Sequence, residues 1–129
     1  MPQYMLLIYT PVDGPPAGSD PEQTSKWFEY TQSLIDAGAH VAGDALQGVD
    51  SATTVRVRDG ETQIIDGPFA ESKEFLAGYY LLDCTDLDTA LGHAARMPNI
   101  HYGSTEVRPV VDMTAMFADA AQAGAQAGE

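Results

Sequence analysis

The stretch "DGPFAESKE", residues 66–74, gathers the side chains of this sequence that are best suited to acid–base chemistry. Asp66 opens it, and Glu71 and Lys73 follow, two residues apart from each other. In an extended chain, residues two apart point to the same face, so Glu71 and Lys73 would lie side by side. A carboxylate can accept a proton, and an ammonium group can stabilise negative charge that develops on an oxygen. This spacing makes Asp66 and Lys73 candidate catalytic residues and Glu71 a candidate substrate contact.

Structural alternatives stay open for the same side chains. The Asp66 carboxylate can accept a backbone N–H of the turn that Gly67 and Pro68 favour. Lys73 can form an exposed ion pair with its acidic neighbours, which stabilises a protein by less than about 1 kcal/mol. The motif is therefore either the edge of a site or a solvated joint between two strands.

Further polar side chains could face the same cavity. We expect Asp36, near the end of the first helix, and His40, shortly after it, to be the other candidate acids or bases. Tyr9 and Asp44 are candidate substrate contacts. Arg56 could bind a carboxylated ligand, or it could pair with acidic side chains across the strands or across a dimer.

Composition excludes several classes of partner. The chain has 129 residues and a net charge of −13, with only 6 lysines and arginines. Binding to nucleic acid or to anionic lipid needs clustered positive charge, so we expect neither partner. The N-terminal "MPQYMLLIYTPVDG" has no basic region and only a short apolar run, which predicts a cytoplasmic protein without a membrane span.

Cysteine and histidine usage predicts a site without a metal or a cofactor. The single cysteine, Cys84, cannot form an internal disulfide or a multi-cysteine metal site, and we expect it to be buried near a strand end. His93 and His101 are eight residues apart across a helix stop, and His40 is remote from both. These spacings match no common metal-binding motif.

The hydrophobic pattern predicts alternating strands and helices in one domain. Asp20-Pro21 is typical of a helix start, Asp86 caps a second helix that Pro98 ends, and Asp59-Gly60 is typical of a hairpin turn. The "TTVRVR" strand alternates valines with arginines and is predicted to be half-buried. The predicted strands cover residues 4–10, 40–46, 53–58, 61–66, 74–83 and 101–111, and the predicted helices cover 21–37 and 87–97.

The order of these elements indicates an α+β fold, a ferredoxin-like βαββαβ arrangement with an inserted hairpin. Residues 1–111 form the predicted domain. The alanine-rich residues 112–129 are predicted to be a tail, either a short helix or disordered.

Several segments together resemble the YCII-related domain family, in its DGPF branch. They are "YMLLIY", "TTVRVRDG", "DGPFAESKE", "GYYLLD", "DLDTALGHAARMP" and "EVRPV", in this order, and the resemblance covers residues 1 to 111. It implies a homodimer in which two ferredoxin-like sheets pair into a dimeric α/β barrel, with a small cavity in each subunit.

The resemblance also implies two functions. Some YCII-like proteins are lyase-like enzymes that use a His and Asp pair without a redox cofactor; here Asp36 keeps the Asp, while Trp27 falls where the His is expected. The leading hypothesis is therefore a small protein that binds or transforms a polar metabolite in a cavity lined by the DGPF motif. The alternative is a regulatory module that associates with an extracytoplasmic-function sigma factor.

Overall fold

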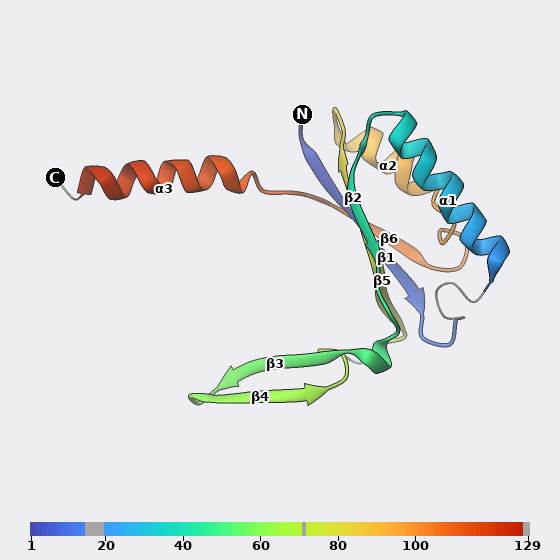
Figure 1. Ribbon diagram of the computed structural model, residues 1–129, viewed down its shortest axis with the longest axis horizontal. Coiled ribbons are helices and arrows are strands. Elements are labelled where there is room, and N and C mark those ends of the chain that lie inside the picture. Colours follow the sequence, from blue (N-terminus) through green and yellow to red (C-terminus); the bar gives the residue numbers. More distant parts are fainter. Residues whose placement is uncertain (15–19, 71, 128–129) are drawn as a thin grey trace.

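The computed structural model describes residues 1–14, 20–70 and 72–127, and Figure 1 shows their arrangement. The strands are β1 (Gln3–Pro11), β2 (His40–Ala45), β3 (Thr53–Arg58), β4 (Glu61–Asp66), β5 (Glu74–Asp83) and β6 (Ser104–Pro109). The helices are α1 (Pro21–Asp36), α2 (Leu87–Ala95) and α3 (Met113–Ala127), and a short 3-10 turn η1 covers Val49–Ser51.

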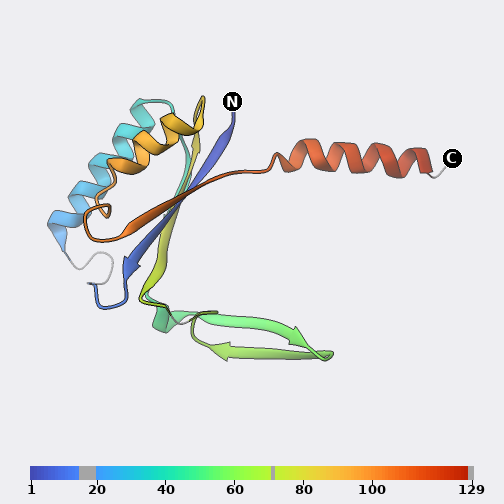
Figure 2. The ribbon, with the colours of Figure 1, turned by 180° about the vertical axis from the view of Figure 1, so that it is seen from behind.

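Four strands form an antiparallel sheet in the order β2-β5-β1-β6. Helices α1 and α2 pack on the same face of this sheet, and the opposite face carries no helix (Figures 1 and 2). This mixed α+β architecture agrees with the ferredoxin-like arrangement that the sequence predicts. The dimeric barrel stays a prediction.

The core lies between the sheet and the two covering helices. Alternate residues of β1 and β5 face the helices, and Leu6 of β1 and Leu82 of β5 are fully buried. Leu34 of α1 is also fully buried against them, and Cys84 is buried at the end of β5 as expected. The core therefore fixes the face of α1 that is turned toward the sheet.

Local signals in the sequence start both covering helices where they were predicted. The Asp20 carboxylate accepts a hydrogen bond from the backbone N–H of Glu22, and Pro21 occupies the first helical position. The Asp86 carboxylate accepts a hydrogen bond from the backbone N–H of Thr89 in the same way. Capping of this kind satisfies backbone donors that a helix leaves unpaired at its first turn.

Two segments extend away from the sheet on the side that α1 and α2 do not cover (Figures 1 and 2). Strands β3 and β4 pair only with each other in a two-stranded sheet, and α3 follows β6. The prediction that β3 is half-buried is wrong for the single chain, because Val55 and Val57 are 64% and 57% exposed. The alternation of valine and arginine was real, but within the described residues the extensive contacts of β3 and β4 are with each other.

In the described part of the chain, no helix combines the length and the apolar character that a membrane crossing requires.

Candidate functional site

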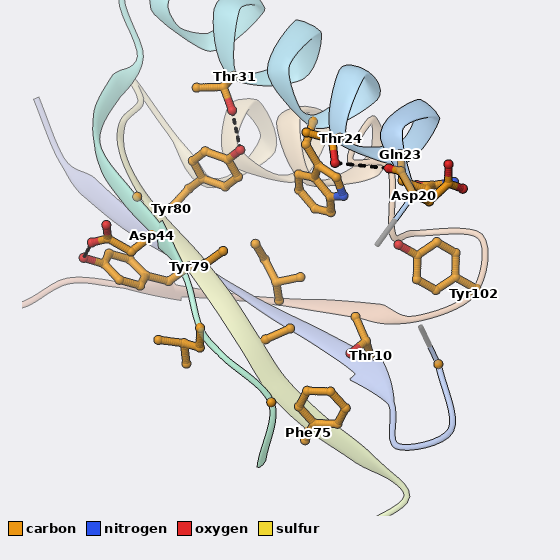
Figure 3. A pocket seen from close by; sticks show the side chains of 18 of the residues that line it. Thr10, Asp20, Gln23, Thr24, Thr31, Asp44, Phe75, Tyr79, Tyr80 and Tyr102 are labelled. Carbon is orange, nitrogen blue, oxygen red and sulfur yellow. Dashed lines mark hydrogen bonds between the residues drawn. The ribbon is translucent and has the colours of Figure 1, made fainter. Parts of the chain in front are cut away.

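A cavity of about 400 Å³ opens between α1 and the four-stranded sheet, beside the edge strand β2 (Figure 3). The α1 side of the cavity is lined by four residues that share one face of the helix: Gln23, Thr24, Trp27 and Thr31. The sheet contributes residues of β1, β2 and β5, and Tyr102 closes one end. The surface of the cavity is mainly apolar, as is typical of sites for small molecules.

Aromatic rings form the centre of this cavity. The indole ring of Trp27 and the ring of Tyr80 are nearly parallel, at 20°, with their centroids 6.4 Å apart. The imidazole of His40 meets the Tyr80 ring edge-on, with centroids 6.1 Å apart. Phe75 of β5 lines the cavity further along the sheet (Figure 3). Stacked and edge-on rings of this kind form flat apolar walls.

Few polar groups point into this apolar surface. The hydroxyls of Thr31 and Tyr80 share a hydrogen bond of 2.5 Å between helix and sheet. At the β2 edge, the Tyr79 hydroxyl donates to the Asp44 carboxylate at 2.7 Å (Figure 3). His40 is the one imidazole that lines the cavity among the described residues, and an imidazole can both donate and accept a proton.

Burial shapes the acidity of the tyrosines in and beside the cavity. Burial raises the pKa of Tyr80 above its ordinary value, and the hydrogen bond with Thr31 opposes this effect. Burial also raises the pKa of Tyr30, whose hydroxyl donates to the backbone carbonyl of His93 at 2.6 Å. The hydrogen bond to Asp44 raises the pKa of Tyr79. All three hydroxyls therefore act as neutral groups near neutral pH.

The cavity brings together only part of the predicted site. His40 and Asp44 line it. The other residues proposed for this site do not line it: Tyr9, Asp36, Arg56, Asp66 and Lys73. Glu71 lies outside the described residues.

The DGPF motif has a structural position that explains its residue types. Asp66 is the exposed last residue of β4, and Gly67 has a φ of +116°, in a region that favours glycine. The Gly67 N–H donates to the Ala52 carbonyl at 2.7 Å, and the Thr54 hydroxyl donates to the Gly67 carbonyl at 2.8 Å. The motif thus closes the open end of the β3–β4 hairpin, which supports its turn role.

The remaining predicted residues have local partners or positions outside the cavity. Asp36, at the last turn of α1, accepts a hydrogen bond from the Gln32 amide at 3.1 Å. Arg56 donates to the Gln63 side chain across the hairpin at 2.7 Å. This contact favours cross-strand pairing, although the partner is an amide and not the acid that the sequence analysis considered.

Sequence reasoning missed the aromatic lining. Neither Trp27 nor Tyr80 was among the candidate site residues. A signal was present, because Trp27 occupies the position where the family resemblance expects a histidine that acts in the site. The residue type differs from that expectation, but the position lines the cavity.

The cavity offers no ready metal site. Among residues 1–14, 20–70 and 72–127, no group of three or more His, Cys, Asp or Glu side chains is close enough to hold a metal ion. The side chains that line the cavity are better suited to an organic molecule, because most of them present carbon.

Comparisons with known proteins agree with the architecture. An uncharacterized protein of Rhizobium meliloti (strain 1021) is 52% identical over 81 residues, which cover 61% of this chain and 65% of that protein. The match thus spans slightly less than two-thirds of the relative's length. The family model of the YCII-related domain matches residues 3–114, which include every element of the four-stranded sheet and both covering helices. The chain therefore belongs to the YCII-related domain family.

Proposed function

We propose that the protein binds a small molecule with a flat apolar body in the cavity between α1 and the sheet. The observation that carries this proposal is the pair of nearly parallel rings, Trp27 and Tyr80, on the wall of a cavity of about 400 Å³. Cavities of roughly 300–1,000 Å³ with apolar walls and few polar groups are typical of small-molecule sites. The proposal moves the site from the DGPF motif to the aromatic wall.

Any proton transfer on the bound molecule is assigned to His40. Of the four candidate catalytic residues, only His40 lines the cavity, while Asp36, Asp66 and Lys73 do not. Its imidazole lies edge-on to Tyr80, so a molecule held against the Tyr80 ring would lie within its reach. This arrangement supports a lyase-like acid–base step without a redox cofactor, with a single imidazole in place of a His and Asp pair.

The binding proposal can be tested at a single resonance. The chain has one tryptophan, so its indole N–H gives one side-chain signal in a ¹H–¹⁵N spectrum, and this signal reports on the cavity directly. Three probes share a benzene ring: anisole is neutral, benzylamine is cationic and benzoate is anionic. We expect at least one of them to shift the Trp27 signal with saturation, at a Kd of about 1 mM for so few atoms.

Two variants locate the bound probe. Tyr80→Leu removes the second ring of the wall and is expected to weaken binding by about tenfold. The control Tyr4→Leu removes a buried ring of the same core that does not line the cavity, so it should leave binding unchanged. If none of the three probes shifts the Trp27 signal of the folded wild type, the proposal fails.

The association with a sigma factor stays a prediction from the family resemblance. Its structural support is α3, which follows β6 and exposes Met116 and Phe117 at 53% and 64%. An exposed apolar helix face can dock into a groove of a partner. Co-purification with a sigma factor, with and without residues 113–129, tests it; equal recovery of both forms would remove α3 from the interaction.

A further inference from the structure

One polar side-chain atom of the cavity lining has no hydrogen-bond partner among the described residues. The side-chain carbonyl oxygen Oε1 of Gln23 is buried and accepts no hydrogen bond from any described residue. Gln23 lies in the first turns of α1 and lines the cavity, beside Asp20 (Figure 3). A buried acceptor without a donor lowers stability, and such groups are rare in folded proteins. A ligand that donates an N–H at this end of the cavity would satisfy Gln23 once its side chain turns the buried oxygen toward the cavity.

The charges around the cavity have one sign. The carboxylates of Asp20 and Asp44 line it, while the described lining residues include no lysine and no arginine. Among the described residues, the Asp20 carboxylate accepts one hydrogen bond, from the Glu22 N–H, so it keeps further acceptor capacity. The whole chain carries a net charge of −13, so the surrounding field also attracts cations and repels anions.

The dipole of α1 does not reverse this preference. A helix N-terminus carries the equivalent of about half a positive charge. The Asp20 and Glu22 carboxylates stand at this same end and carry a full negative charge each. The aromatic rings nearby add a further attraction, because the face of an indole or phenol ring is electronegative and binds cations.

We propose that the molecule bound in this cavity is an amine, an apolar ring body carrying a cationic N–H group held by Gln23 Oε1 and Asp20. This inference rests on the proposed function, since it names the chemical class of the ligand for the same cavity. The ring body lies against Trp27 and Tyr80, and the ammonium group points to the N-terminal end of α1. An anionic ligand of the same shape would meet two carboxylates and, among the described lining residues, no lysine or arginine.

The three benzene probes separate this inference from the binding proposal. We expect benzylamine to bind at least about tenfold more tightly than benzoate, because only the amine donates N–H groups to the Asp20 carboxylate and the Gln23 carbonyl. Titration of the Trp27 signal measures both affinities. We expect this preference to shrink at high salt, since part of it is electrostatic. If anisole or benzoate shifts Trp27 as well as benzylamine does, the cavity binds small molecules but the amine inference is overturned.

Two variants assign the recognition to named atoms. Gln23→Leu removes the acceptor and is expected to weaken benzylamine about fivefold while leaving anisole unchanged. Its control is Gln32→Leu, an exposed amide further along α1 that does not line the cavity. Unchanged benzylamine binding in Gln23→Leu would overturn the role of this residue.

Asp20→Asn removes one negative charge and keeps a good helix cap, so the fold should persist. We expect it to lower the preference for benzylamine over anisole by about threefold. Asp86→Asn makes the same change at the N-cap of α2, outside the cavity, and should leave the preference as it is. Equal effects of the two variants would mean that only the net charge of the protein matters, and they would overturn the contact with Asp20.

Discussion

Gly43 makes room for the central ring of the cavity. A Cβ atom at Gly43 would lie 2.8 Å from Cδ1 of Tyr80 and 3.0 Å from the backbone oxygen of Tyr79. Both distances are too short for carbon in a packed interior, and the Tyr79 oxygen belongs to the strand that pairs with β2. A residue without a side chain is therefore needed at this point of β2 for Tyr80 to stack beside Trp27.

We expect Gly43→Ala to displace the Tyr80 ring and to weaken probe binding. The overpacking should lower the free energy of unfolding by about 1–3 kcal/mol. The measurement is a urea titration followed by Trp27 fluorescence, together with benzylamine binding to the folded protein. Gly92→Ala is the matched control, because its Cβ would meet nothing and a helix interior gains about 0.5–1 kcal/mol from alanine. Unchanged binding in Gly43→Ala would contradict this role for the Tyr80 ring.

Tyr30 should make the protein sensitive to alkali. Burial raises the pKa of its hydroxyl above the value of about 10 that an unfolded chain would show. The folded state therefore keeps the proton while the unfolded state loses it, so this stability is full below pH 10 or so and is lost as the pH rises further. We expect the free energy of unfolding to fall more steeply above about pH 10 in the wild type than in Tyr30→Phe. Urea titrations of both proteins at several pH values measure this free energy of unfolding.

Tyr102→Phe is the control for this alkaline effect, because Tyr102 is exposed and lies outside the hydrophobic core. It should leave the pH dependence of unfolding as in the wild type. Parallel curves for the wild type and Tyr30→Phe would contradict a buried, protonated Tyr30.

At the scale of elements, the DGPF turn holds the β3–β4 hairpin in register. Thr53 pairs with Asp66 at the open end of the hairpin, and Gly67 then turns the chain with a φ of +116°. We expect Gly67→Ala to destabilise the hairpin by about 1–2 kcal/mol, because a side chain is strained in this conformation. Faster hydrogen exchange of the β3 and β4 amides, with the amides of β1 and β5 unchanged, would show a local effect.

Asp66→Asn tests whether the DGPF turn contributes to binding in the cavity. Asp66 is exposed and does not line the cavity, so this substitution should leave the binding of all three benzene probes unchanged. A loss of probe binding in Asp66→Asn, with the hairpin amides still protected, would return the site to the DGPF motif.

The elements of the sheet and both covering helices could be predicted because their signals are local. Asp20 and Asp86 start helices through hydrogen bonds within one turn, Pro21 suits the first helical position, and apolar runs such as residues 4–10 mark buried strands. The cavity could not be predicted in the same way. It depends on how α1 lies over β2 and β5, which brings Trp27 next to Tyr80 across 53 residues of sequence. His40 and Asp44 line the cavity, but no spacing in the sequence required them there, while the apolar walls resembled ordinary core.

At the scale of the whole molecule, the apolar surface is distributed unevenly. The β3–β4 hairpin and α3 both extend on the side of the sheet opposite α1 and α2 (Figure 2). Ile64 on the hairpin is 70% exposed and Phe117 on α3 is 64% exposed. Apolar side chains gathered on one side of a small protein favour an interface. We expect a second copy of the chain to cover them, in agreement with the homodimer that the family resemblance implies.

We expect removal of residues 113–129 to weaken this self-association by at least about tenfold, because the apolar side chains of α3 then no longer contribute. Sedimentation equilibrium of the wild type and of the truncated chain measures it. Each copy carries a charge of −13, so the two copies repel each other, and added salt should strengthen the wild-type dimer by screening this repulsion.

A pair of point variants decides which side of the molecule forms the interface. Phe117→Asp places a charge on α3 and should dissociate the dimer, whereas Phe28→Asp makes the same change at a 70% exposed position of α1, on the other side of the sheet. Dissociation by Phe28→Asp and not by Phe117→Asp would place the contact on the helical face. In that case the uncovered sheet face, the hairpin and α3 would face solvent or a different protein, and the partner of α3 would have to be sought among regulatory proteins.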